Sequence, residues 1–140
     1  MIITFFTFLG IKFSSYKKQQ IMFIDDMIYL CDCIVLILKT YVLDTDEIIK
    51  KLNNDERLKK YDIYCISEKS SFDAQIARHL SDLSNTLGKY DANSQINYIC
   101  EINNFLSSKR KQYSDYYFKH SKLYFALGIT MGFLITILLY

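Results

Sequence analysis

The sequence contains no proline and no tryptophan, and only four of its 140 residues are glycine. Proline is the residue that most strongly breaks a helix, so its absence favours long uninterrupted helices. A nucleotide-binding loop needs clustered glycines followed by lysine, a pattern that the scattered glycines do not supply. They stand at Gly10, Gly88, Gly128 and Gly132. The chain is therefore not predicted to hydrolyse nucleotides.

The net charge is small, and the residue patterns of catalytic sites are lacking. The net charge of +2 argues against a nucleic-acid-binding face. His79 and His120 stand alone, and no Ser-His-Asp or Cys-His arrangement is evident. The cysteines lack zinc-site spacing and are interpreted as small buried apolar residues; they are Cys31, Cys33, Cys65 and Cys100. We predict no catalytic, cofactor-binding or metal-binding residues, and hence no enzyme.

Residues 123–140 form an uncharged run that directly follows a charged, helix-patterned stretch. As a helix the run would be ~27 Å long, close to the ~30 Å hydrocarbon thickness of a bilayer. Lys119 and Lys122 precede it, and such flanking positive charge favours the cytoplasmic face. We expect a C-terminal transmembrane helix at residues 123–140. A buried core helix of a soluble protein is the alternative.

Residues 1–11 are uncharged too, and they end at Lys12, with Lys17 and Lys18 beyond. This run is short for a span. It also lacks the preceding basic residue and the small-residue cleavage site of a signal peptide. We expect residues 1–18 to form a short N-terminal membrane segment, truncated if the start codon of the gene is placed too late.

Residues 20–122, between these two segments, are predicted to form one cytoplasmic helical bundle. Residues 21–38 carry apolar side chains at three- and four-residue steps, as a core helix does. Asp44, followed by Glu47, is the expected N-cap of a short helix that ends at Asn53 and Asn54. Residues 55–71 are weakly patterned and are expected to form short helix and loop.

The next helix is expected to be capped by Ser71 and ended by Gly88. Asp91 or Asn93 would cap a final helix, which has no breaker before Gly128 and should run into the membrane. The apolar face of the earlier helix consists of Phe72, Ile76, Leu80, Leu83 and Leu87. Charged residues elsewhere are interpreted as solvated helix surface; they include Asp25, Asp26, Glu56, Arg57, Lys59 and Lys60.

The C-terminal part of the sequence resembles the stage III sporulation protein AB family. The resemblance covers roughly the last sixty residues: a helix closing in Leu-Gly, an Asp and then a Gln, and a glycine-spaced membrane helix. Family members usually begin with a full-length membrane segment, which the N-terminus lacks. The residues at family motif positions, with a structural or partner-contact role, are Leu87, Gly88, Asp91, Gln95, Leu127, Gly128 and Gly132.

This resemblance implies a membrane protein of the mother cell, in the channel that connects mother cell and forespore during endospore formation. It also implies similarity to the platform proteins of type II secretion and type IV pilus systems, whose helical bundles dock an ATPase. The implied partners are the stage III sporulation protein AA ATPase and the other stage III sporulation A membrane proteins, in the outer forespore membrane. Gly128 and Gly132 form a G-x-x-x-G spacing that permits helix association, and so a homo-oligomer.

Two other functions are less well supported by the sequence. A small phage-derived or holin-like membrane protein is disfavoured, because pore formers of that kind need little cytoplasmic mass. A membrane-bound enzyme would need a polar constellation that the sequence does not display.

Overall fold

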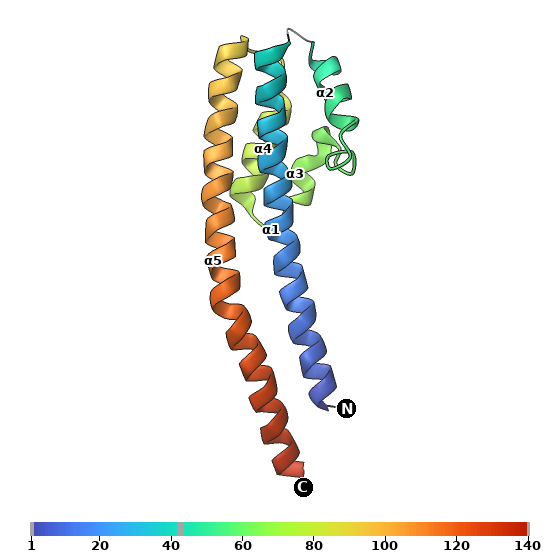
Figure 1. Cartoon of the computed structure of the whole chain (residues 1–140), viewed down its shortest axis with the longest axis vertical. Coiled ribbons are helices and arrows are strands. Elements are labelled where there is room, and N and C mark those ends of the chain that lie inside the picture. Colours follow the sequence, from blue (N-terminus) through green and yellow to red (C-terminus); the bar gives the residue numbers. More distant parts are fainter. Residues whose placement is uncertain (1, 42–43, 140) are drawn as a thin grey trace. The chain divides into compact units, whose positions relative to one another are not determined.

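The computed structural model of the chain describes residues 2–41 and 44–139, and in these residues the secondary structure is helical, with no strand. The predicted all-α fold with a long apolar C-terminal helix is confirmed. The elements, labelled in part in Figure 1, are α1 (Ile2–Thr40), α2 (Thr45–Asn53), the 3-10 helix η1 (Ile63–Cys65), α3 (Ile66–Lys69), α4 (Ala74–Thr86) and α5 (Ala92–Leu139).

The helices divide into two compact units. The bundle unit is Phe23–Lys109, and the terminal unit combines Met1–Met22 with Arg110–Tyr140. Helices α1 and α5 are each divided between the two units, with one segment in each unit. The predicted division into residues 1–18, 20–122 and 123–140 rests on membrane burial, which these contacts do not test, and it stays a prediction.

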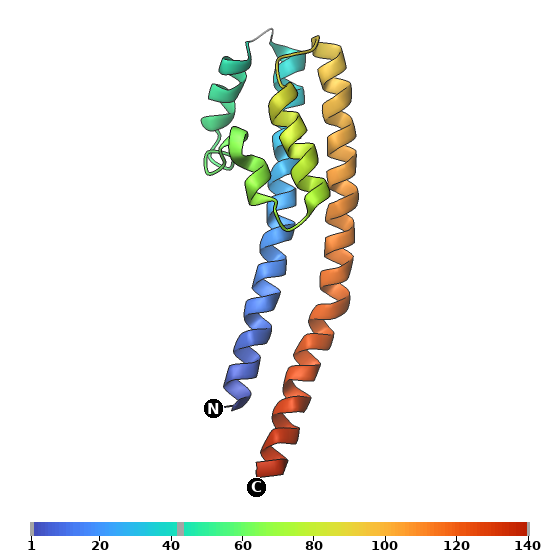
Figure 2. The same ribbon diagram turned by 180° about the vertical axis from the view of Figure 1, so that it is seen from behind.

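The bundle unit contains every buried apolar side chain of the described residues. Its segments of α1 and α5 lie beside α4, while α2 and α3 lie on the side of α1 away from α5 (Figures 1 and 2). The predicted stripe on α1 supplies Ile24, Met27, Cys31 and Ile34 to this core. The other members are Phe23, Leu30, Ile48, Leu52, Leu58, Ile63, Ile66, Ile76, Leu80, Leu83, Leu87, Ile99, Ile102 and Leu106.

The structure tests two predicted helix caps. Asp44 is the N-cap residue of α2, as expected, but its side chain makes no capping hydrogen bond. Helix α4 is capped by Asp73 and not by Ser71, because the Asp73 carboxylate accepts from the backbone N–H groups of Gln75 and Ile76, at 2.9 and 3.3 Å. An N-cap side chain reaches the second and third helical N–H groups, and Ser71 lies too far upstream of the helix to do so.

The four cysteines differ in burial and therefore in expected reactivity. Cys31 is buried in the core, and its pKa is raised to about 12 by burial and by the negative charge of Asp32. The prediction of buried cysteines is wrong for Cys65 and Cys100, which are exposed. Because the thiolate is the reacting species, alkylation of the folded chain at about pH 8 should modify Cys65 and Cys100 and spare Cys31. Mass spectrometry of the labelled peptides measures this. Equal labelling of Cys31 and Cys100 would contradict the buried position of Cys31.

The terminal unit pairs the first part of α1 with the last part of α5. The rings of Phe13 and Tyr124 are 5.4 Å apart, and the hydroxyl groups of Ser14 and Tyr117 are 3.1 Å apart. The residue number falls along α5 as it rises along α1, so the two segments are antiparallel.

The surface of the terminal unit is strongly apolar. Large side chains such as Phe125 and Ile137 are 68% and 73% exposed, and similar residues follow the whole end of α5. Among the described residues, α5 is the one helix that contains a segment long and apolar enough to cross a membrane. An apolar surface of this extent marks a membrane or protein contact and is compatible with membrane association.

Candidate functional site

A buried carboxylate, Asp26 on α1, organises the polar part of the bundle unit. Its side chain is 8% exposed and accepts hydrogen bonds from Arg57 Nε, from Lys60 Nζ at 2.8 Å and from the Tyr61 hydroxyl at 2.7 Å. The prediction that Asp26 is an ordinary solvated residue is therefore wrong, whereas Arg57 and Lys60 are exposed, as predicted, but pair with Asp26. The segment after α2 folds over α1, so donors more than thirty residues away in sequence converge on one carboxylate.

Packing explains why this segment lies over α1. Leu58 is buried, and the Tyr61 ring packs edge-on against Phe23 at 5.6 Å. Asp55 accepts from the Tyr29 hydroxyl at 2.8 Å and from the Arg57 backbone N–H at 2.8 Å. The apolar contacts thus fix the segment, and its Arg57 and Lys60 side chains then face Asp26.

The cluster is ionised at neutral pH. Burial by itself would raise the pKa of Asp26, but the hydrogen bonds from Lys60, Arg57 and Tyr61 outweigh burial and hold this pKa below its usual value. The hydrogen bond to Asp26 in turn raises the pKa of Arg57 and that of Lys60. A carboxylate saturated with donors is a poor proton acceptor, so the cluster fits a structural role better than acid–base chemistry.

The same cluster presents positive charge to solvent. The side chains of Arg57 and Lys60 are 46% and 55% exposed although they contact Asp26. Lys69 donates to the Lys60 carbonyl at 2.9 Å. Lys59, Lys60 and Lys69 line one polar hollow of about 440 Å³. We call these four residues, Arg57, Lys59, Lys60 and Lys69, the cationic surface.

Leu87 and Gly88, at the first motif positions, close α4. Leu87 is buried, and Gly88 has the positive φ of 83° that favours glycine, as predicted for the residue that ends the helix. A Cβ atom at Gly88 would lie only 1.7 Å from Thr45 Oγ1. Gly88 therefore serves both the turn and the close approach of α2.

Asp91 and Gln95 begin α5. The Asp91 carboxylate accepts from the Ser94 backbone N–H at 3.1 Å, which confirms Asp91 as the cap. Gln95 is buried, and its side-chain amide donates to the Tyr90 carbonyl at 3.2 Å. The structure thus brings four of the motif residues together in the α4–α5 turn.

The remaining motif residues, Leu127, Gly128 and Gly132, lie on α5 in the terminal unit. Leu127 is half-exposed, and a Cβ at Gly128 would meet no atom within 4 Å. No described contact identifies a partner helix for these glycines, so helix association through them stays a prediction.

Comparison with protein families decides the identity. The family model of stage III sporulation protein AB matches residues 55–140, which is more than half of the chain. The chain belongs to the stage III sporulation protein AB family. Comparison with curated proteins and with solved structures gave no match. Membership in the stage III sporulation protein AB family gives the chain a sporulation-related role, and the match includes the cationic surface, the α4–α5 turn and all of α5.

Within residues 2–41 and 44–139, no three His, Cys, Asp or Glu side chains gather as metal ligands. Asp26 is the functional candidate that sequence reasoning missed. The chain carries one signal for it, a carboxylate within the apolar stripe of a core helix, but the pairing with Arg57 and Lys60 has no local sequence pattern.

Proposed function

We propose that this stage III sporulation protein AB family member is a non-enzymatic platform component of the channel between mother cell and forespore. Its bundle unit docks a cytoplasmic ATPase, stage III sporulation protein AA. The observation that carries the proposal is the family match over residues 55–140. The same chain contains a compact helical unit and a membrane-span candidate. This combination suits a protein that holds a soluble motor at a membrane.

The same reasoning supports a location in the mother cell membrane that faces the forespore, with the bundle unit in the cytoplasm. Lys119 and Lys122 precede the apolar run of α5, and Lys12, Lys17 and Lys18 follow the apolar start of α1. Because α1 and α5 are antiparallel in the terminal unit, both groups of lysines lie toward the same end of that unit. Positive charge flanking a span favours the cytoplasmic side.

We assign the ATPase contact to the cationic surface. Asp26 already holds Arg57 and Lys60 in place, so these side chains lose little freedom when a partner binds. Exposed cations of this kind fit an acidic surface on the partner. Lys59 is the best residue for a test, because it lies on this surface and is not a ligand of Asp26.

The proposed function is tested by affinity capture from sporulating cells with the full-length, tagged and detergent-solubilised chain. We expect the ATPase to be retained in about equal amount, and Lys59→Glu to reduce its retention severalfold. Lys50→Glu, a charge reversal at an exposed lysine of α2, is the matched control and should retain the ATPase. A wild-type chain that captures no ATPase would overturn the platform role. If Lys59→Glu retains as much ATPase as the Lys50→Glu control, the assigned surface is overturned.

A further inference from the structure

The terminal unit contains a groove between its antiparallel segments of α1 and α5. The groove has a volume of about 390 Å³, within the ~300–1,000 Å³ range of small-molecule sites. Residues of both helices line it, including Gly10, Lys17, Tyr116, Phe125 and Gly128. Neither the family match nor the proposed function accounts for it.

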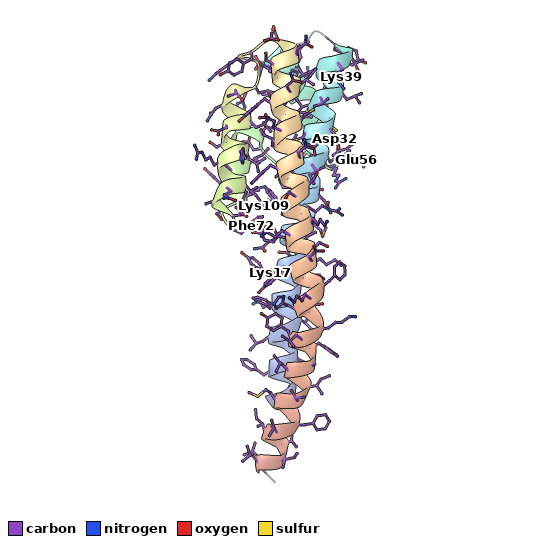
Figure 3. The ribbon with its side chains drawn as sticks, turned by 90° about the vertical axis from the view of Figure 1, so that its left-hand side faces the viewer. Lys17, Asp32, Lys39, Glu56, Phe72 and Lys109 are labelled. Atoms are coloured by element: carbon purple, nitrogen blue, oxygen red, sulfur yellow. The ribbon has the colours of Figure 1, made fainter. Side chains whose placement is uncertain are left out.

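The two ends of the groove differ in chemistry. At one end, Lys17 Nζ lies 5.9 Å from the centre of the Phe13 ring and 5.7 Å from that of Tyr116; Figure 3 labels Lys17. Tyr116 precedes the apolar run of α5 by seven residues, so this end belongs at the membrane surface. The other end, at Phe125 and Gly128, belongs in the hydrocarbon. The groove therefore runs from a cationic mouth to an apolar interior.

Two glycines keep the interior open. A Cβ atom placed on Gly10 or on Gly128 would meet no atom within 4 Å, so the space beside both helices is unfilled. A phospholipid acyl chain has the linear, apolar shape that such a space accepts. Side chains added at these positions would occupy the groove without a clash.

Charge is segregated between the two units in a way that selects the occupant. The terminal unit holds seven of the seventeen Lys and Arg residues but one of the fifteen Asp and Glu residues, Asp115. The bundle unit consequently carries ten basic against fourteen acidic residues. A cationic segment at a membrane attracts anionic lipid headgroups. A second copy of the chain would instead bring a further cationic unit against this one.

We propose that the groove binds one anionic phospholipid, with its phosphate at the Lys17 ammonium and one acyl chain along Gly10, Phe125 and Gly128. The inference needs the terminal unit in a membrane but does not depend on the ATPase. It adds a lipid site to a protein whose proposed role concerns protein partners.

Native mass spectrometry of the full-length chain in detergent tests the proposal, with phosphatidylglycerol and phosphatidylcholine supplied in equal amounts. We expect one phosphatidylglycerol molecule to be retained per chain in preference to phosphatidylcholine. Equal retention of both lipids would overturn the role of the anionic headgroup. A dimer without bound lipid would overturn the proposal, because a second copy of the chain would then occupy the groove.

Two variants with matched controls locate the site. Lys17→Gln should weaken phosphatidylglycerol retention roughly fivefold, because one lysine near a headgroup is lost. Gly128→Leu should abolish retention by filling the groove. Lys111→Gln removes a lysine charge and Ala126→Leu enlarges a small residue, both on α5 outside the groove lining, so these controls should bind as the wild type does. Helicity by circular dichroism verifies folding. Wild-type retention by Lys17→Gln, or by a folded Gly128→Leu, would overturn the groove as the site.

Discussion

Replacing Gly88 with alanine should lower the free energy of unfolding of the bundle unit by about 2–3 kcal/mol. Gly88 has a φ of 83°, where a side chain costs roughly 1–2 kcal/mol. The new Cβ would also lie 1.7 Å from Thr45 Oγ1, so α2 or the Thr45 rotamer must shift. Both costs fall on a turn that joins α4 to α5 and lies against the start of α2.

Cys31 provides the measurement, because this buried thiol reacts only when the core opens. A loss of about 2–3 kcal/mol corresponds to a roughly 30- to 150-fold higher labelling rate when opening is in rapid equilibrium. The variants Gly88→Ala, Thr45→Ala and their combination form a double-mutant cycle that separates the clash from the backbone strain. In the combined variant the clash should be relieved, so the free energy of unfolding should recover by that part, while the loss due to backbone strain should remain. An unchanged labelling rate in Gly88→Ala would contradict the positive φ and the close contact together.

The fold features that could be predicted from the sequence rest on local signals. Gly88 ends α4 because glycine accepts positive φ, and Asp91 caps α5 because its carboxylate reaches the Ser94 N–H group. The apolar spacing of α4 identified Ile76, Leu80 and Leu83 as buried. In each case the residue and its partners lie within a few positions, so the sequence itself shows the interaction.

Interactions between distant residues could not be predicted in this way. Asp26 and Arg57 are 31 positions apart, and their pairing depends on how the segment after α2 folds over α1. The contact between Phe13 and Tyr124 spans a still longer separation. Even the cap at Asp73 required knowing where α4 begins, since Ser71 is an equally acceptable residue type. The helices could therefore be predicted from local sequence patterns. The Asp26 cluster and the groove could not, because they depend on tertiary packing.

The Asp26 cluster links stability to the proposed docking surface. One buried carboxylate fixes Tyr61 through its hydroxyl and two cations through their charge, and these cations remain about half exposed. Removing the negative charge would leave Arg57 and Lys60 repelling each other across the same small region. The stability of the segment after α2 and the arrangement of the cationic surface should therefore be lost together.

Replacement of Asp26 by asparagine should accordingly destabilise the bundle unit by about 2 kcal/mol at neutral pH. Hydrogen bonds to a charged group contribute about 1.5–3 kcal/mol each, but Arg57 and Lys60 are half-exposed and recover part of this through water. For a domain of this size, the melting temperature should fall by about 8–16 °C. Far-UV circular dichroism of the full-length chain in detergent measures it. Glu56→Gln removes an exposed carboxylate nearby, labelled in Figure 3, and should leave the melting temperature unchanged.

The pH dependence distinguishes the charge of Asp26 from its shape. The folded-state pKa of Asp26 lies below its usual value of 3.8, so its stabilisation is complete above 3.8 and is lost as pH falls through the lower folded-state pKa. Asp26→Asn should remove this component and flatten the acid side of the stability profile. Some slope should remain, because hydrogen bonds from Tyr29 to Asp55 and from Ser94 to Asp91 lower those two pKa values as well. An acid profile as steep in Asp26→Asn as in the wild type would show that Asp26 is not ionised in the folded bundle.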